Sequence, residues 1–178
     1  RSHASARMPA RFQLVAAMNP CPCGWRGSAL RECRCLEPEV ARYRAKISGP
    51  LLDRIDLHVA LAAVPWKDML REGRSGESSE QVLARVRAAR GLQLERYRSE
   101  PWSTNAELPT AALPRHCALR ADARALLERA VSALGLSMRA VVRCLRVART
   151  IADLSGASAI DVGHIAEAIS YRDASRAP

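Results

Sequence analysis

The sequence predicts an α/β portion followed by an all-α portion, and two patterns indicate this fold class. Apolar runs typical of buried strands, "FQLVAA" at 12–17 and "IDLHVAL" at 55–61, lie in the first part of the chain. From residue 78 onward the apolar residues recur instead at the three- and four-residue spacing of helices. With 178 residues, 48% of them hydrophobic, the chain can build one large core or two small ones.

The α/β portion is expected over residues 1–64. Its first strand stops at Asn19 because the following proline cannot donate to a strand ladder, so Asn19 lies at the carboxyl end of that strand. A helix is predicted over 37–46, ahead of the second strand. Residues 65–77 are polar and irregular, which is typical of a linker.

The all-α portion is expected over 78–178, and the ends of its helices are marked. Ser78, followed three residues later by a glutamine, is a capping-box signature for a helix that runs to about residue 98. Further helices are predicted over 121–134, from the cap Ser137 to Gly156, and from the cap Asp161 onward.

The net charge of +10, carried almost wholly by arginine, suits a polyanionic partner such as DNA. Abundant alanine and arginine are also expected if the coding genome is rich in G and C, so the charge alone does not decide. No apolar stretch has membrane-spanning length, and the first residues lack the apolar segment of a secretory signal. We therefore expect a cytoplasmic protein without a membrane partner, whose six cysteines are free thiols or metal ligands rather than disulfides.

Four cysteines form a C-x-C, nine residues, C-x-C pattern around a loop with little apolar content. Such a set offers four thiolates to one tetrahedral Zn²⁺, which would be structural because four cysteines leave no open position. The single residue inside each pair is fewer than zinc sites usually have, so a redox-active or empty thiol cluster is the other interpretation. The predicted ligands are Cys21, Cys23, Cys33 and Cys35, while Cys117 and Cys144 lie in apolar helical stretches and are expected in the core.

Arginines at two places could meet an anion. Arg54 lies between Asp53 and Asp56 in "SGPLLDRIDLH", where an exposed ion pair is the simpler interpretation. Four more follow Ser137 at spacings of four, three and three, opposite the apolar stripe of their helix: Arg139, Arg143, Arg146 and Arg149. Such a stripe is usually only a solvated face, but four unpaired arginines repel one another and an anion would relieve that repulsion.

The sequence contains no phosphate-binding loop of the G-x-x-x-x-G-K-[ST] type and no apolar strand that ends in paired acids able to hold Mg²⁺. Its four histidines show no metal-binding spacing. We therefore expect that the chain cannot bind and cleave a nucleotide unaided.

These pieces, in this order, resemble the carboxyl-terminal half of the magnesium-chelatase-like AAA+ ATPases, in the branch of the ComM-type competence helicase. The matching segments span nearly the whole chain and are "PARFQLVAAMNPCPCG", "ISGPLLDRIDLH", "GESSEQVLARVRAAR", "LSMRAVVRCLRVARTIADL" and "HIAEAISYR". The resemblance implies the last part of an AAA+ α/β core over 1–64 and a helical lid domain over 78–178. It also implies a homo-hexamer with ATP and Mg²⁺ as cofactors of the complete protein.

By the same resemblance, three residues would act on the transferring phosphoryl group. Asn19 would be the sensor-1 residue that orients the attacking water, and Arg54 the arginine finger that reaches the γ-phosphate of a neighbouring subunit. Arg139 would be the sensor-2 arginine on the lid, with Arg143 as a second contact to the nucleotide. The family's phosphate-binding loop and Mg²⁺-binding acids precede the first residue here, so hydrolysis is expected to need an amino-terminal half. Membership alone does not imply the zinc.

Three functions are open at this point. The first is the sensor and lid half of a hexameric, ATP-driven motor on branched or single-stranded DNA. The second is the ATPase subunit of a complex that inserts a metal into a tetrapyrrole. The net charge of +10 suits DNA better than it suits a partner of this kind. The third is a non-enzymatic, zinc-stapled DNA-binding module.

Overall fold

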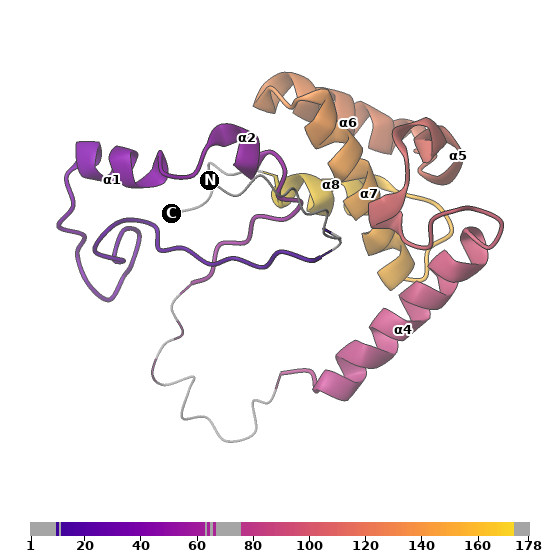
Figure 1. Ribbon diagram of the computed structural model, residues 1–178, viewed down its shortest axis with the longest axis horizontal. Helices are drawn as coiled ribbons and strands as arrows, with labels where there is room; N and C mark the ends of the chain where they lie inside the picture. The colour runs from indigo at the N-terminus through magenta and orange to yellow at the C-terminus, as the bar shows by residue number, and fades with distance from the viewer. Residues whose placement is uncertain (1–9, 11, 63, 65, 67–75, 173–178) are drawn as a thin grey trace, which may run out of the picture. The chain divides into compact units, whose positions relative to one another are not determined.

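The computed structural model describes residues 10, 12–62, 64, 66 and 76–172, and the chain divides into two compact units, Arg1–Arg44 and Ala45–Pro178. The first unit contains helix α1 (Glu37–Arg44). The second contains α2 (Gly49–Leu52), α4 (Ser79–Arg96), α5 (Leu113–His116), α6 (Ala121–Leu134), α7 (Met138–Leu154) and α8 (Val162–Ser170), with the 3₁₀ helices η1 (Asn105–Glu107) and η2 (Thr110–Ala112) (Figure 1). None of the described helices combines the length and apolar character needed to span a bilayer.

The two predicted strands are not formed in the described residues, and this corrects the α/β part of the expectation. Residues 12–19 and 57–62 have neither helix nor strand structure, and the described residues contain one isolated parallel bridge, between Leu119 and Ile160. A strand needs a neighbour that pairs with its backbone, and a buried strand needs one that covers its side chains. Here Phe12 is 77% exposed and Leu61 is 86% exposed. The apolar pattern therefore identified two segments whose large apolar side chains are mostly exposed.

The first unit has almost no hydrophobic core. Among its described residues, Cys21 and Val40 are the buried apolar side chains. Helix α1 begins at Glu37, as predicted, and ends two residues earlier than predicted. The Arg26 guanidinium donates two hydrogen bonds, of 2.8 and 3.1 Å, to the Glu37 carboxylate and so ties the preceding loop to the helix. With so little apolar area buried, the hydrophobic effect alone gives this loop little stability.

Helix ends in the second unit lie where the sequence predicts them. Helix α4 begins at a capping box in which the Ser78 and Gln81 side chains each accept from the other's backbone N–H. Gly135 ends α6 with a φ of +60°, in the left-handed region that glycine adopts without strain. Ser137 caps α7 and Asp161 caps α8. The predicted all-α portion is confirmed.

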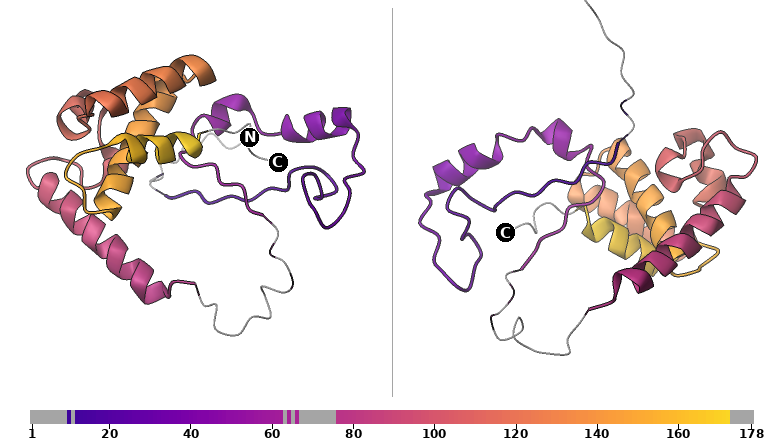
Figure 2. Two further views of the ribbon diagram at one scale, coloured as in Figure 1. Left: turned by 180° about the vertical axis from the view of Figure 1, so that it is seen from behind. Right: turned by 60° about the horizontal axis from the view of Figure 1, so that its bottom comes forward.

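Helix α7 lies at the centre of the second unit. It packs against α8, α4, η1 and α5, and α6 packs on α8 (Figure 2). In α6, α7 and α8, apolar residues at three- and four-residue spacing lie in or against the core, whereas Leu134, the last residue of α6, is 43% exposed. Cys117 and Cys144 are buried there as predicted, and burial raises the pKa of each thiol to about 11. The core consists of Tyr97, Leu108, Leu113, Cys117, Ala123, Leu127, Cys144, Ala148, Ala152, Ile160, Ile165 and Ala168.

A buried ion-pair network joins α4, η1 and α7. The fully buried Asp153 carboxylate accepts from Arg96 Nη1 at 2.9 Å, from Asn105 Nδ2 at 2.8 Å and from Arg149 Nε at 3.1 Å. Burial opposes ionisation of Asp153, but the hydrogen bonds from Arg96 and Asn105 outweigh it and lower its pKa. Arg149 is 2% exposed and also donates to two carbonyls of the loop after α7. The expected solvated arginine face is therefore wrong at Arg149, because its side chain is buried in contacts with Asp153 of the same helix and with the carbonyls of the loop that follows.

Residues 45–62 belong to the second unit. The backbone N–H of His58 donates to the Tyr171 carbonyl at 2.9 Å, and Arg172 Nη1 donates to the Ile55 carbonyl at 2.5 Å. The compact units thus divide at residue 44. The predicted linker, 65–77, falls mostly outside the described residues, so the domain limits 1–64 and 78–178 stay a prediction.

Candidate functional site

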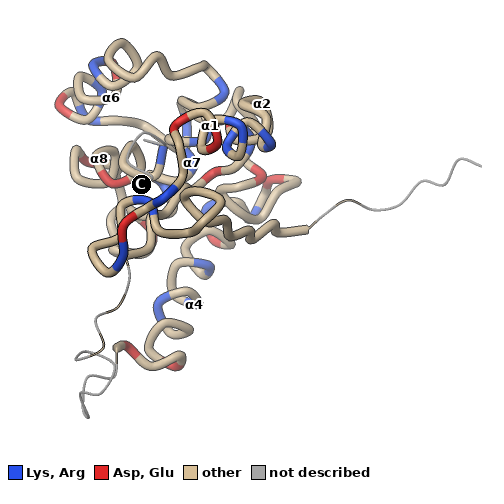
Figure 3. Tube along the Cα trace, turned by 90° about the vertical axis from the view of Figure 1, so that its left-hand side faces the viewer, with Lys and Arg blue, Asp and Glu red and all other residues tan. Residues whose placement is uncertain are grey.

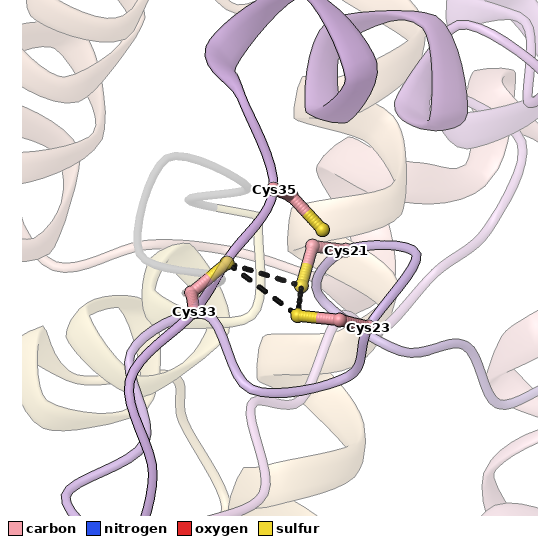
Figure 4. Close-up of side chains that lie close together, drawn as sticks. All are labelled: Cys21, Cys23, Cys33 and Cys35. Atoms are coloured by element: carbon pink, nitrogen blue, oxygen red, sulfur yellow. Dashed lines mark hydrogen bonds between the residues drawn. The ribbon is translucent and has the colours of Figure 1, made fainter.

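The four predicted cysteine ligands come together in the first unit (Figure 4). Cys21 Sγ lies 3.4 Å from Cys23 Sγ and 3.6 Å from Cys33 Sγ, and the last two sulfurs are 3.6 Å apart. All four sulfur atoms, including that of Cys35, lie within 4.8 Å of one another. A disulfide would bring two sulfurs to about 2.05 Å, so these are free thiols in a cluster that could bind a metal.

Two glycine turns allow this convergence. Gly24 has a φ of +80° and Gly27 a φ of +76°, both in the left-handed region, where a side chain would be strained. The Gly24 N–H donates to the Cys21 carbonyl at 3.0 Å and closes the first turn. The loop therefore returns on itself within the nine residues that separate the two cysteine pairs.

The thiols of the cluster titrate unequally. Hydrogen bonds from the backbone N–H groups of Trp25 and Arg34 to the Cys23 sulfur lower its pKa to about 6. At Cys35 a backbone hydrogen bond from Cys23 lowers the pKa, but desolvation and the neighbouring thiols of Cys23 and Cys21 outweigh it and raise the pKa to about 12. The loop thus directs backbone donors at sulfur, as a site for thiolates requires, while the crowded thiols oppose the simultaneous loss of all four protons.

Asn19 lies at the entrance to the cysteine loop and is exposed. A Cβ atom at Gly24 would lie 3.7 Å from both Cγ and Nδ2 of Asn19, so the side-chain amide packs against the backbone of the first turn. The structure therefore places the predicted sensor beside the cysteine loop, although in an extended segment rather than at the end of a strand.

The two acids beside Arg54 are paired with other groups. Asp53 accepts from Ser137 Oγ at 3.2 Å, and its carboxylate lies 3.7 Å from Arg172 Nη2. Asp56 forms an ion pair with Arg143. The simpler interpretation of Arg54, an ion pair with its flanking acids, is therefore wrong among the described residues.

The guanidinium of Arg54 is left exposed by these contacts. Within the described part of the chain it makes one hydrogen bond, to the Pro50 carbonyl at 3.2 Å. Arg139, in the first turn of α7, is also exposed and has no ion pair or hydrogen bond from its side chain to any described residue. Because Asp53 binds Ser137, the backbone positions of Arg54 and Arg139 lie within one and two residues of the same contact.

The other arginines of the α7 stripe have partners within the second unit. Arg143 is occupied by Asp56, so its predicted role at the nucleotide competes with this ion pair. Arg146 Nη2 donates to the Leu108 carbonyl at 2.5 Å. Of the four, Arg139 is the one whose guanidinium remains available in the described structure.

Charge is dispersed over the long helices. Figure 3 shows basic residues on α1, α4, α6 and α7, and each of these helices also carries acidic residues. The net charge of +10 is thus a property of the whole chain, and none of these four helices is a purely basic element.

Sequence reasoning missed the residues that organise this arrangement. Arg172, beyond the end of α8, binds the Ile55 carbonyl and the Asp53 carboxylate, more than 100 residues away in the chain. Ser137 was recognised as a helix cap, but its second hydrogen bond, to Asp53, has no local sequence signal. The alternation of acid and arginine at 53–56 was the available hint, and it pointed to the wrong pairing.

Comparison with known families matches both parts of the chain. Residues 76–172 match the model described as "Magnesium chelatase, subunit ChlI C-terminal". Residues 1–69 match the model described as "Magnesium chelatase, subunit ChlI". The two matches follow one another in the chain, with the change between them in the predicted linker.

Similar proteins cover almost all of the chain. The "Competence protein ComM" of Haemophilus influenzae is 42% identical over 173 residues, which are 97% of this chain and 33% of that protein. The uncharacterized protein YifB of Escherichia coli is 41% identical over the same shares. The uncharacterized protein Rv2897c of Mycobacterium tuberculosis is 40% identical over 92% of this chain and 32% of its own length. The chain thus spans about a third of the length of the curated relatives it matches.

Proposed function

This chain belongs to the magnesium-chelatase-like family, in its ComM-type branch, and on that premise we propose that it is the sensor and lid portion of an ATP-driven motor on branched or single-stranded DNA. The motor is a homo-hexamer of the complete protein, with ATP and Mg²⁺ as cofactors. The rest of the complete protein supplies the phosphate-binding loop and the Mg²⁺-binding acids. It also supplies the AAA+ sheet that covers the apolar segments 12–17 and 55–61, most of whose large apolar side chains are exposed here.

The observation that carries this proposal is the pair of exposed arginines, Arg54 and Arg139, which lie one and two residues along the chain from the hydrogen-bonded Asp53 and Ser137. Phosphoryl transfer spreads negative charge over the phosphate oxygens, and positive groups placed there in advance stabilise the transition state. Both guanidinium groups are free to meet such a charge because the nearby carboxylates are already paired. In this role Arg54 acts on the nucleotide of a neighbouring subunit.

Asn19 supplies a different function. Its amide carries both a donor and an acceptor, which suits a residue that orients a water molecule for attack on the γ-phosphate. Its exposed position beside the cysteine loop leaves that amide accessible. The proposed machinery of this chain is therefore Asn19, Arg54 and Arg139.

DNA is the proposed client because the chain carries a net charge of +10. A relative named as a competence protein agrees with that choice. Because net positive charge is the basis for this choice, we expect binding through the phosphate backbone, with salt dependence and little sequence preference.

The chain by itself is expected to show no ATP turnover above a blank, because its sequence has no element that cradles the β- and γ-phosphates. Phosphate release measures this directly, with the complete protein as the positive control and buffer as the blank. Turnover by the isolated chain that Arg139→Ala abolishes would contradict the proposed division of labour.

In the complete protein, Arg139→Ala is expected to slow ATP turnover by about 10² to 10³, the usual effect of removing one donor from a developing negative charge. Movement of a labelled DNA branch should slow in parallel with turnover. Arg129→Ala provides the matched control, since Arg129 is an exposed arginine on α6 whose side chain forms no ion pair with a described residue. Equal ATP turnover by the two variants would contradict the role of Arg139. If the intact hexamer did not move the labelled DNA branch, DNA as the client would be contradicted.

A further inference from the structure

We infer that Cys21, Cys23, Cys33 and Cys35 bind one structural Zn²⁺, and that this ion fixes the turn against which the Asn19 amide packs. The first part of the inference concerns the chain alone. The second part rests on the proposed function, because it assigns the ion an effect on the sensor residue.

The sulfur positions fit a tetrahedral zinc ion. Four sulfurs at about 2.3 Å from a central Zn²⁺ lie about 3.8 Å from one another. The three pairs among Cys21, Cys23 and Cys33 are 3.4 to 3.6 Å apart, close to this value and far from the length of a disulfide. Cys35 completes the set within 4.8 Å, so its half-buried side chain needs a shift of no more than about 1 Å to reach the spacing of a zinc ligand.

The donor set selects the kind of ion. Four thiolates in a tetrahedral arrangement bind Zn²⁺ or iron, whereas Mg²⁺ and Ca²⁺ require oxygen ligands. A site with four protein ligands has no open coordination position, so the ion is structural rather than catalytic. Backbone N–H groups of Trp25 and Arg34 directed at Cys23 provide the outer hydrogen bonds that metal-bound thiolates usually receive.

The first unit also needs such an ion. Its described residues bury two apolar side chains, Cys21 and Val40, and Cys21 is itself one of the four ligands. The free energy of binding a structural zinc ion adds directly to the free energy of folding. One ion would therefore join the two cysteine pairs and stabilise the loop, which buries too little apolar surface to be stabilised by the hydrophobic effect alone.

The connection to Asn19 follows from the turn that begins at Cys21. Gly24, the fourth residue of that turn, has a φ of +80°, and a Cβ atom at this position would be in van der Waals contact with the Asn19 side chain. An ion that holds the sulfurs of Cys21 and Cys23, together with those of Cys33 and Cys35 beyond Gly24, restricts the backbone of the turn. Loss of the ion should release the surface on which the Asn19 amide rests.

Metal analysis of this chain, purified without added zinc, tests the site itself. We expect about one zinc per chain for the wild type and for Ser28→Ala, a control in the same loop, and less than about a tenth of an equivalent for Cys23→Ser. After chelation, Co²⁺ added to the wild-type chain should give the intense visible absorption of a tetrahedral tetrathiolate, a readout that depends on no variant. A metal-free wild type without a cobalt spectrum, or an equivalent of iron in place of zinc, would overturn the zinc assignment.

Turnover by the complete protein tests the effect on Asn19. Cys23→Ser should lower the rate constant for ATP hydrolysis, and the double variant with Asn19→Ala should turn over no more slowly than Asn19→Ala alone, since both changes remove the same positioned amide. Losses that multiply in the double variant would overturn the coupling while leaving the zinc site standing. Full activity of Asn19→Ala would instead contradict the proposed role of Asn19. Metal analysis does not depend on that role, so the two failures can be told apart.

Discussion

Arg54→Ala in the complete protein is expected to lower ATP turnover by about 10³ to 10⁵, the range measured for arginine fingers, while ATP binding and folding stay nearly intact. The expectation follows from the contacts around Arg54. Both flanking acids are paired elsewhere, with Arg172 and with Arg143, so removal of the Arg54 guanidinium breaks no ion pair among the described residues. A large loss of turnover would then have to come from the reaction rather than from the fold.

Arg124→Ala is the matched control for this experiment, because Arg124 is an exposed arginine whose side chain contacts no described charged group. Its turnover should equal that of the wild type. If Arg54 were only a surface residue, Arg54→Ala would behave like Arg124→Ala, with at most about 1 kcal/mol of lost stability and little change in rate. Thermal unfolding of all three proteins separates an effect on stability from an effect on turnover.

Asp153→Ala is expected to destabilise the second unit by about 3 to 5 kcal/mol, the cost of leaving buried charges without their partner. The substitution removes the carboxylate that Arg96, Arg149 and Asn105 all contact. Arg149 is 2% exposed, so water cannot replace the lost carboxylate at its guanidinium. Urea unfolding of this chain, followed by the helical signal, measures the loss. Glu128→Ala, which removes an exposed acid on α6, should change stability by less than about 0.5 kcal/mol.

The pH dependence of unfolding gives an independent check on Asp153. Its pKa in the folded protein is lowered below the ordinary 3.8, so the unfolded chain binds this proton more readily than the folded one. The stabilisation is therefore fully present above pH 3.8 and is lost as the pH falls through the folded-state pKa. The stability difference between wild type and Asp153→Asn should shrink in that acid range, and a constant difference would contradict the ionised state of Asp153.

Local signals predicted the second unit well. Ser78, Gly135, Ser137 and Asp161 each satisfy or terminate backbone groups within a few residues, so their effect on structure can be derived from neighbouring sequence. The strands at 12–17 and 55–61 could not be predicted in the same way. A strand forms only beside another strand, and that partner is a long-range feature that an apolar pattern does not contain.

The candidate site divides along the same line. The cysteine pairs lie 14 residues apart at most, and their convergence was predicted from spacing alone. The pairing of Asp56 with Arg143 and of Asp153 with Arg96 links residues more than 50 positions apart, and helical periodicity wrongly placed Arg149 in solvent. Periodicity indicates which side chains share a face, but the other elements of the fold determine whether that face is covered.

Mixed hexamers provide the most direct test of whether Arg54 acts on a neighbouring subunit. One set of subunits of the complete protein carries Arg54→Ala, the other is disabled in the phosphate-binding loop, and ATP hydrolysis is followed as their ratio varies. Each kind alone should be inactive, but a site in the mixture can combine an intact loop with the intact Arg54 of its neighbour, so we expect activity to recover. No recovery, in hexamers shown to contain both kinds of subunit, would mean that Arg54 does not act on the nucleotide of a neighbour.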